Sequence, residues 1–157
     1  MNSHAPSLPS LFPLESTVSF TPLLEKIGDS RLVLLGGASY GRREFYEWRM
    51  RLTERLIKEK GFSFIAAEGD WNSCYEVNRF VKGKRYQGQS VQSALRHFKF
   101  WPTWVWANEE MEGFVRWLLE YNKALSEDKK VGFYGLGIYS LNESVNALAT
   151  YAEKMMI

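Results

Sequence analysis

The chain has 157 residues, of which 45% are hydrophobic and 24% are charged, a composition typical of one folded globular domain and not of a disordered chain. A net charge of +2 and the lack of a Lys/Arg run argue against nucleic-acid and anionic-membrane binding, and the basic spot at residues 82–85 fits a solvated loop. No apolar stretch approaches the ~20 residues that span a bilayer, and the single Cys74 excludes an internal disulfide and a Cys-based zinc cluster.

The N-terminal part of the chain is predicted to lead into one domain. Residues 1–14 carry Ser, Pro and Asn, which indicates a loose lead-in to a domain over residues 15–157. This lead-in has no basic region followed by an apolar run, so it is not a signal peptide, and we expect a cytoplasmic protein. A short helix is predicted over residues 20–27. Residues 31–35 (RLVLL) form a short apolar run between turn residues, which predicts a strand buried on both faces.

Helices and strands alternate along the rest of the chain. The pattern indicates an α/β fold, in which parallel strands are joined by right-handed helical crossovers. Thr103 is the predicted N-cap of the longest late helix, and Cys74 is expected to be a buried structural thiol. Helices are predicted at 42–60, 72–81, 91–97, 103–125 and 141–156, and strands at 62–67 and 131–136.

The carboxyl ends of the predicted strands indicate where a site would lie, because ligands bind there in open parallel sheets. In this chain those ends are residues 36–41, 68–71 and 135–140. If the strands are neighbours, the three loops converge on one crevice. The residues that we then expect to face it are Ser39, Tyr40, Glu68, Asp70 and Tyr139.

Glu68 is the strongest of these candidates. A carboxylate at the end of a buried strand is costly unless it is hydrogen-bonded or used in chemistry. A structural role, such as capping the next helix or pairing with an Arg, fits its position equally well. Asp70 is better explained as the N-cap of the helix that begins near Trp71. Arg49, two turns into the preceding helix, either reaches back to the crevice or lies at the surface.

The first loop, Gly-Gly-Ala-Ser-Tyr-Gly at 36–41, matches no common catalytic motif. Its Ser39 has no His in an arrangement typical of a catalytic triad. The spacing of its glycines differs from that of a nucleophile elbow, and it matches the glycine spacing of the dinucleotide-binding fingerprint poorly. Neither His4 nor His97 is predicted to act as a catalytic base. The aromatic segment 98–106 offers contacts for a hydrophobic ligand, with ordinary core packing as the alternative; its tryptophans are Trp101, Trp104 and Trp106.

Four segments together resemble the erythromycin esterase family, in the family's order and spacing. They are LVLLGGASYGRREFYEWR (32–49), GFSFIAAEGDWNSCYEVNRFVKG (61–83), FWPTWVWANEEMEGFVRWLLEYN (100–122) and VGFYGLGIYSL (131–141). The resemblance implies an α/β domain with a helical elaboration and a deep cleft. It also implies hydrolysis of a carboxylic ester by a base-activated water, the ester being the macrolactone of a macrolide in the resistance enzymes. We expect no metal and no cofactor.

The chain departs from the family at positions that carry chemistry. The family's first loop usually reads G-E-A-S-H-G, and its Glu and His are Gly37 and Tyr40 here; the Asp of the third loop is Gly137. Glu68 and Arg49 match the family. Loss of a positioned base typically costs ~10²–10⁴-fold in rate, and a phenol with a pKa near ~10 is protonated at neutral pH.

The resemblance therefore implies a site that is partly kept. Its catalytic candidates are Glu68, Arg49 and Tyr40, the last at the family's His position, and its substrate-binding candidates are Ser39, Trp71 and Trp104. Family members are longer, so we expect the N-terminal portion of one, incomplete at its C-terminus, with self-association through exposed apolar surface. Three functions stay open: an impaired hydrolase acting on a small-molecule ester or macrolide-like ligand, a non-catalytic small-molecule-binding protein, and a fragment without independent function.

Overall fold

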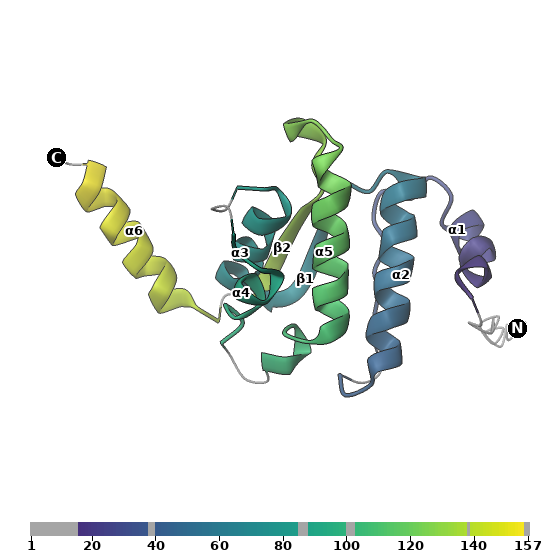
Figure 1. Ribbon diagram of the computed structural model, residues 1–157, viewed down its shortest axis with the longest axis horizontal. Helices are drawn as coiled ribbons and strands as arrows, with labels where there is room; N and C mark the ends of the chain where they lie inside the picture. The colour runs from purple at the N-terminus through teal and green to yellow at the C-terminus, as the bar shows by residue number, and fades with distance from the viewer. Residues whose placement is uncertain (1–15, 38–39, 85–87, 100–102, 138, 156–157) are drawn as a thin grey trace, which may run out of the picture. The chain divides into compact units, whose positions relative to one another are not determined.

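The computed structural model describes residues 16–37, 40–84, 88–99, 103–137 and 139–155. The chain divides into two units, Met1–Leu34 and Leu35–Ile157 (Figure 1). The first unit holds a 3-10 turn, η1 (Thr17–Phe20), followed by helix α1 (Thr21–Ile27). The helix predicted over residues 20–27 is confirmed, and it ends where the backbone amide of Gly28 donates to the carbonyls of Leu24 and Glu25.

The strand predicted at residues 31–35 is not formed. Residues 31–37 are in neither a helix nor a strand, and the side chains of Leu32 and Leu34 are 72% and 84% exposed. A strand buried on both faces needs a hydrogen-bonded neighbour and covering side chains. Within the described ranges the sheet consists of β1 and β2 alone, and residues 31–35 form no strand, so the prediction of a third strand is wrong.

The sheet of the second unit is parallel, as the α/β prediction requires. Strand β1 (Phe64–Asp70) pairs with β2 (Gly132–Gly137), from Phe64 opposite Gly132 to Ala67 opposite Gly135, with an irregularity between Ala67 and Asp70. Side chains alternate between the two faces of a strand. One face packs on the core through Ile65, Ala67 and Phe133, and the other carries Phe64, Tyr134 and Leu136.

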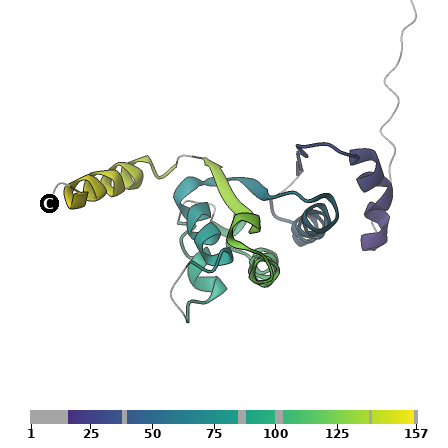
Figure 2. The same ribbon diagram turned by 90° about the horizontal axis from the view of Figure 1, so that it is seen from above.

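Four of the helices, α2 to α5, surround the core, and the helices follow one another along the chain in the order that the sequence predicted. Helix α3 lies against β2 and α5, α4 packs on α3 and α5, and α2 packs on α5 (Figures 1 and 2). Short 3-10 turns, η2 and η3, precede α5 and β2. The helices are α2 (Arg43–Lys60), α3 (Trp71–Val81), α4 (Val91–Leu95), α5 (Glu109–Lys123) and α6 (Leu141–Met155), and the turns are Thr103–Val105 and Glu127–Lys129.

Helix α5 begins later than predicted. Thr103 lies in η2, and the N-cap is Asn108, whose side chain accepts a hydrogen bond from the amide of Met111 at 2.8 Å. Three glutamates in the first turn favour this start, because negative charge stabilises a helix N-terminus. Thr103 is therefore wrong as the N-cap, although a helix in this region is confirmed.

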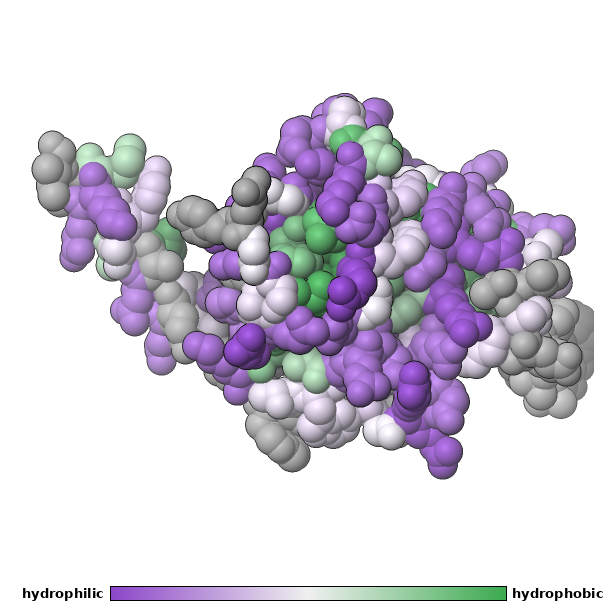
Figure 3. All heavy atoms as spheres, in the orientation of Figure 1, coloured by the Kyte–Doolittle hydropathy of each residue, from purple (hydrophilic) through white to green (hydrophobic). Residues whose placement is uncertain are grey.

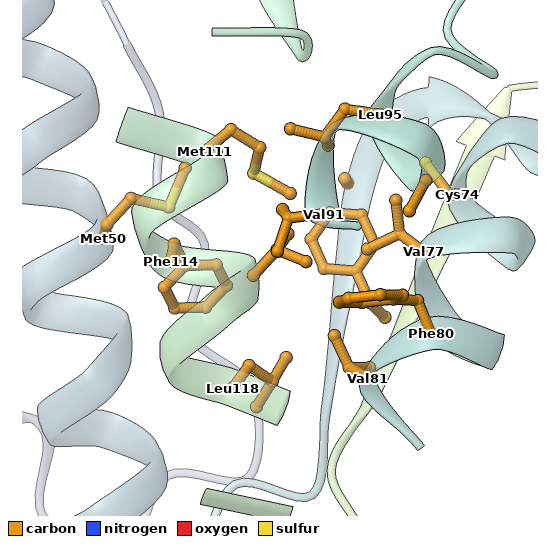
Figure 4. Close-up of a cluster of buried hydrophobic side chains, with 14 of the residues drawn as sticks. Met50, Cys74, Val77, Phe80, Val81, Val91, Leu95, Met111, Phe114 and Leu118 are labelled. Atoms are coloured by element: carbon orange, nitrogen blue, oxygen red, sulfur yellow. The ribbon is translucent and has the colours of Figure 1, made fainter. Parts of the chain in front are cut away.

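The hydrophobic core lies between the sheet and helices α2 to α5 (Figure 4). Met111 and Leu118 of α5 are fully buried and Phe114 is 3% exposed; their spacing of three and four residues puts them on one face of the helix. Trp117 is partly buried and stacks between Phe114 and Tyr121, with ring centroids 5.6 and 5.3 Å away. Burial of these large side chains is the main stabilising contribution to the unit.

Helix α6 differs from the other helices of its unit in that its apolar side chains are exposed. Figure 3 shows hydrophobic residues at the surface of this helix. They recur at helical spacing, so they share one stripe, and each is 55% to 68% exposed. The stripe consists of Leu141, Val145, Leu148, Tyr151 and Met155. Self-association through such a surface stays a prediction.

Candidate functional site

The candidate site lies at the carboxyl end of β1, where the first two loops meet. The hydroxyl of Tyr40 donates a hydrogen bond to Oε2 of Glu68 at 3.0 Å, across 28 residues of sequence. Both side chains are exposed, Tyr40 by 51%. The structure thus brings together two of the residues that the sequence predicted for the site, even though the strand expected before Tyr40 is absent from the described sheet.

The hydrogen bond fixes the chemical state of Tyr40. Donation to Glu68 raises the pKa of the Tyr40 phenol, and the negative charge of the same carboxylate raises it further. The phenol is therefore neutral at physiological pH and acts as a donor. It does not replace the histidine base that the family resemblance implies at this position.

Arg49 reaches back from α2 toward the first loop. A Cβ placed on Gly37 would lie 2.2 Å from Nη2 of Arg49, so the guanidinium occupies the space beside this glycine. On the same face of α2, the Arg49 guanidinium carbon is 5.8 Å from the ring centroid of Tyr46. The Arg49 Nε and the Tyr46 hydroxyl are both buried, and neither has a hydrogen-bond partner among the described residues. Sequence reasoning missed Tyr46, and its position three residues before Arg49 was the available signal.

Trp106 holds the backbone at the end of β1. Its indole N–H donates to the carbonyl of Glu68 at 2.9 Å. A Cβ on Gly69 would lie 2.9 Å from Sγ of Cys74 and 3.2 Å from the Trp106 indole nitrogen, so only glycine fits between them. From the sequence, Trp106 was expected to contact a hydrophobic ligand or to pack in the core, and this hydrogen bond was not predicted. Cys74 is fully buried with its pKa raised by burial to about 12, which confirms a structural thiol.

Asp70 joins the end of β1 to the start of α6. It is 4% exposed, and its Oδ2 accepts hydrogen bonds from the amide and the hydroxyl of Ser73, both at 3.1 Å, which confirms it as the N-cap of α3. Its Oδ1 accepts from the amide of Ser140 at 2.9 Å. Asn72 adds hydrogen bonds to the hydroxyls of Ser140 and Ser144 at 2.7 and 3.0 Å. The third loop therefore meets the second, as expected.

Asp70→Asn is expected to lower the free energy of unfolding by ~1–3 kcal/mol at pH 7, because an amide NH₂ replaces one of two buried acceptor oxygens. Burial by itself raises the pKa of Asp70, but hydrogen bonds from Ser140 and Ser73 outweigh it and hold the pKa below its usual value. A lowered pKa stabilises the fold above the unfolded pKa of ~4, and this stabilisation is lost as the pH falls through the folded pKa.

The check is thermal unfolding of the native chain, of Asp70→Asn and of the surface variant Asp29→Asn at pH 7 and at pH 3. The difference in melting temperature between the native chain and Asp70→Asn is expected to be smaller at pH 3 than at pH 7. Asp29→Asn is expected to have the melting temperature of the native chain at both pH values. An equal gap at the two pH values would contradict the assigned network.

The predicted substrate-binding residues lie in different surroundings. Trp71 is 44% exposed and stacks on Tyr75 and Tyr134, with centroids 6.0 and 6.4 Å away and interplanar angles of 9° and 21°. Trp104 is 46% exposed in η2, and no hydrogen bond or ring contact between described residues joins it to the Tyr40–Glu68 pair. Ser39 lies outside the described residues. The roles of all three stay predictions.

Two hollows lie away from the strand ends. One of about 460 Å³ lies between α4 and the segment leading into α5, and one of about 280 Å³ lies between α2 and α5. Neither is lined by Tyr40, Arg49 or Glu68, so the residue chemistry, and not the size of a hollow, identifies the candidate site. Over the described ranges, no three His, Cys, Asp or Glu residues gather in a way that could hold a metal ion, and no helix is long and apolar enough to cross a membrane.

Comparisons with known proteins agree with the resemblance of the sequence. The family model for erythromycin esterase matches residues 57–156. Erythromycin esterase type II of Escherichia coli is 34% identical over 119 residues, which are 76% of this chain and 26% of that protein. The chain thus spans about a quarter of the length of this curated relative.

Two solved structures share the fold. A protein from Bacillus cereus matches with a TM-score of 0.68 and 28% identity, over 89% of this chain and 32% of that one. A succinoglycan biosynthesis protein matches with a TM-score of 0.64 and 26% identity, over 82% of this chain and 30% of that one. In both, more than four fifths of this chain corresponds to about a third of the larger protein.

Proposed function

Because the chain belongs to the erythromycin esterase family, we propose that it carries part of a site that hydrolyses a carboxylic ester by a base-activated water, with reduced activity. The observation that carries the proposal is the Tyr40–Glu68 hydrogen bond at the end of β1. The bond involves the exposed carboxylate of Glu68, which lies near the carboxyl end of β1, and ligands of parallel sheets bind at the carboxyl ends of the strands. The substrate would be a small-molecule ester, with macrolide-like lactones as the class that the name of the Escherichia coli relative suggests.

Glu68 is the group that would take the proton from the attacking water. An ionised carboxylate can only accept hydrogen bonds and can take up a proton. The neutral phenol of Tyr40 donates a hydrogen bond to the Glu68 carboxylate and so holds it in position. Arg49, whose guanidinium lies beside Gly37 of the first loop, would supply positive charge for the oxyanion that develops as water attacks the ester carbonyl. Gly37 and Tyr40, at the positions of the family's Glu and His, are the reason to expect low activity, because neither provides a base.

A second candidate is non-catalytic binding of an apolar small molecule. The observation in its favour is the exposed stack of Trp71 on Tyr75 and Tyr134, beside the end of β1. Flat aromatic faces bury much apolar area of a ligand at little entropic cost. A ligand held there would need no base, so the losses at Gly37 and Tyr40 would not matter to this function.

The test is hydrolysis of p-nitrophenyl esters and of erythromycin by the native chain, by Glu68→Gln and by Glu120→Gln as a matched control at an exposed glutamate of α5. We expect slow hydrolysis by the native chain that falls at least ~10²-fold in Glu68→Gln and persists in Glu120→Gln. Native hydrolysis that survives Glu68→Gln would refute the assignment. No hydrolysis, together with a rise in melting temperature on adding a macrolide, would favour the second candidate.

A further inference from the structure

We propose that the apolar stripe of α6 binds the open face of the sheet in a second copy of this chain, so that two copies exchange their α6 helices. The open face is the side of β1 and β2 that points away from the core. Its apolar side chains are Phe64, Tyr134 and Leu136, and Trp71 and Tyr75 of α3 continue it. The proposal concerns assembly and does not depend on hydrolysis.

The first observation is that the described part of the chain covers the sheet on one side only. The core side, with Ile65, Ala67 and Phe133, is packed against the helices. On the other side, Phe64 and Leu136 are 58% and 72% exposed. Parallel sheets ordinarily carry helices on both faces, because each face is apolar and is stabilised by burial. The open face therefore has the surface that a packed helix would cover.

The second observation is that α6 has the surface that a sheet would cover. The five side chains of its stripe share one side of the helix and are each 55% to 68% exposed. An amphipathic helix of this kind is stabilised when its stripe is buried against another element. A helix that directly follows a parallel strand ordinarily packs back onto the sheet, and α6 directly follows β2. The stripe and the open face are therefore complementary.

The third observation is that α6 does not cover the sheet of its own chain, because the stripe and the open face are both exposed. Hydrogen bonds hold the first turn of α6 at the end of β1. Asp70 accepts from the amide of Ser140 at 2.9 Å, and Asn72 donates to the hydroxyl of Ser144 at 3.0 Å. Swinging the helix onto its own sheet would move Ser144 away from Asn72, whereas docking on a second copy keeps these bonds.

The two surfaces are also large enough for a stable dimer. Each copy supplies one stripe and one open face, so a two-fold axis closes the assembly. At their exposed fractions, the apolar side chains of the two surfaces amount to on the order of 1,000 Å², and the reciprocal pairing uses this area twice. A stable protein–protein interface buries about 1,200–2,000 Å² in total. A second copy of the chain is therefore a sufficient partner.

The test measures the molar mass of the full chain by size exclusion with light scattering, over a series of concentrations. The native chain is expected to have twice the 18.2 kDa of one copy. Leu148→Glu, in the middle of the stripe, and Leu136→Lys, in the open face, are each expected to weaken dimerisation at least ~10²-fold, because each buries a charge without a partner. Asn146→Glu is the matched control on the polar side of α6 and is expected to keep the dimer.

Mixing the two variants identifies which surfaces meet. In a mixed pair, α6 of Leu148→Glu docks on the open face of Leu136→Lys, where the opposite charges compensate each other, and the other stripe and open face are native. The mixture is therefore expected to regain the mass of a dimer. A monomeric native chain overturns the proposal. A dimer that survives Leu136→Lys also overturns it, because the helices would then pair with each other. So does a mixture of variants, folded by circular dichroism, that stays monomeric.

Discussion

The double variant Gly37→Glu/Tyr40→His is expected to hydrolyse a p-nitrophenyl ester on the order of 10²-fold faster than the native chain, the lower end of what a positioned base contributes. An imidazole at residue 40 would have its pKa near ~6.5, close to working pH, in place of a phenol whose pKa Glu68 raises. The hydrogen bond from Tyr40 shows that residue 40 already reaches Glu68. A glutamate at residue 37 meets only the flexible end of Arg49, which can turn to pair with it.

The measurement is kcat/KM between pH 5 and pH 9, where the double variant should show an inflection near the imidazole pKa that the native chain lacks. Tyr40→Phe is the matched control: it removes the phenol and supplies no base, so no comparable gain is expected. Adding Glu68→Gln to the double variant should cancel most of the gain. An equal gain in Tyr40→Phe, or a folded double variant without gain, would contradict the assigned roles.

Asn122→Ala is expected to lower the free energy of unfolding by ~3 kcal/mol. Asn122 is 1% exposed; its amide donates to the carbonyls of Val81 and Val131 at 3.0 and 2.9 Å, and its oxygen accepts from the amide of Val131 at 2.8 Å. One side chain thus joins the end of α3 to the residue before β2. Truncation leaves three buried backbone groups without hydrogen-bond partners. Each unpaired group costs ~1–3 kcal/mol, and a water molecule that enters the space and bonds to these groups reduces the total.

Urea unfolding at pH 7 checks this value, with linear extrapolation to zero denaturant. Asn142→Ala is the control, because Asn142 is an exposed residue of α6 and surface substitutions usually change stability by less than ~0.5 kcal/mol. A loss below ~1 kcal/mol in Asn122→Ala would mean that the three backbone groups find other partners.

Features that depend on local sequence could be predicted. The apolar spacing of α2 and the cap of α3 at Asp70 are set by residues within a few positions of one another. The strand at residues 31–35 could not be judged this way, because an apolar run does not specify which backbone will pair with it. The start of α5 was missed for a related reason: Thr103 and Asn108 are both good caps, and the acidic first turn decides between them.

In the candidate site, too, some features could be predicted from the sequence and others could not. The meeting of Tyr40 with Glu68 was predicted from the rule that loops at strand ends converge, although the strand before Tyr40 is not part of the described sheet. The contact of Trp106 with the Glu68 carbonyl and the unpartnered hydroxyl of Tyr46 depend on how side chains pack in three dimensions. An aromatic residue in an apolar pattern looks the same in sequence whether it fills the core or holds a strand end.

The close approach of the two paired strands at their carboxyl ends has a consequence for how this scaffold can diverge. A Cβ on Gly135 would lie 2.6 Å from the carbonyl oxygen of Gly69 and 2.7 Å from that of Asp70, so the strand ends touch through backbone alone. Residues 37 and 40 take no part in that contact. Substitutions in the first loop can therefore change the reactivity of the surface without moving the two strands, and the same pair of strands can carry a hydrolytic, a binding or a chemically silent loop.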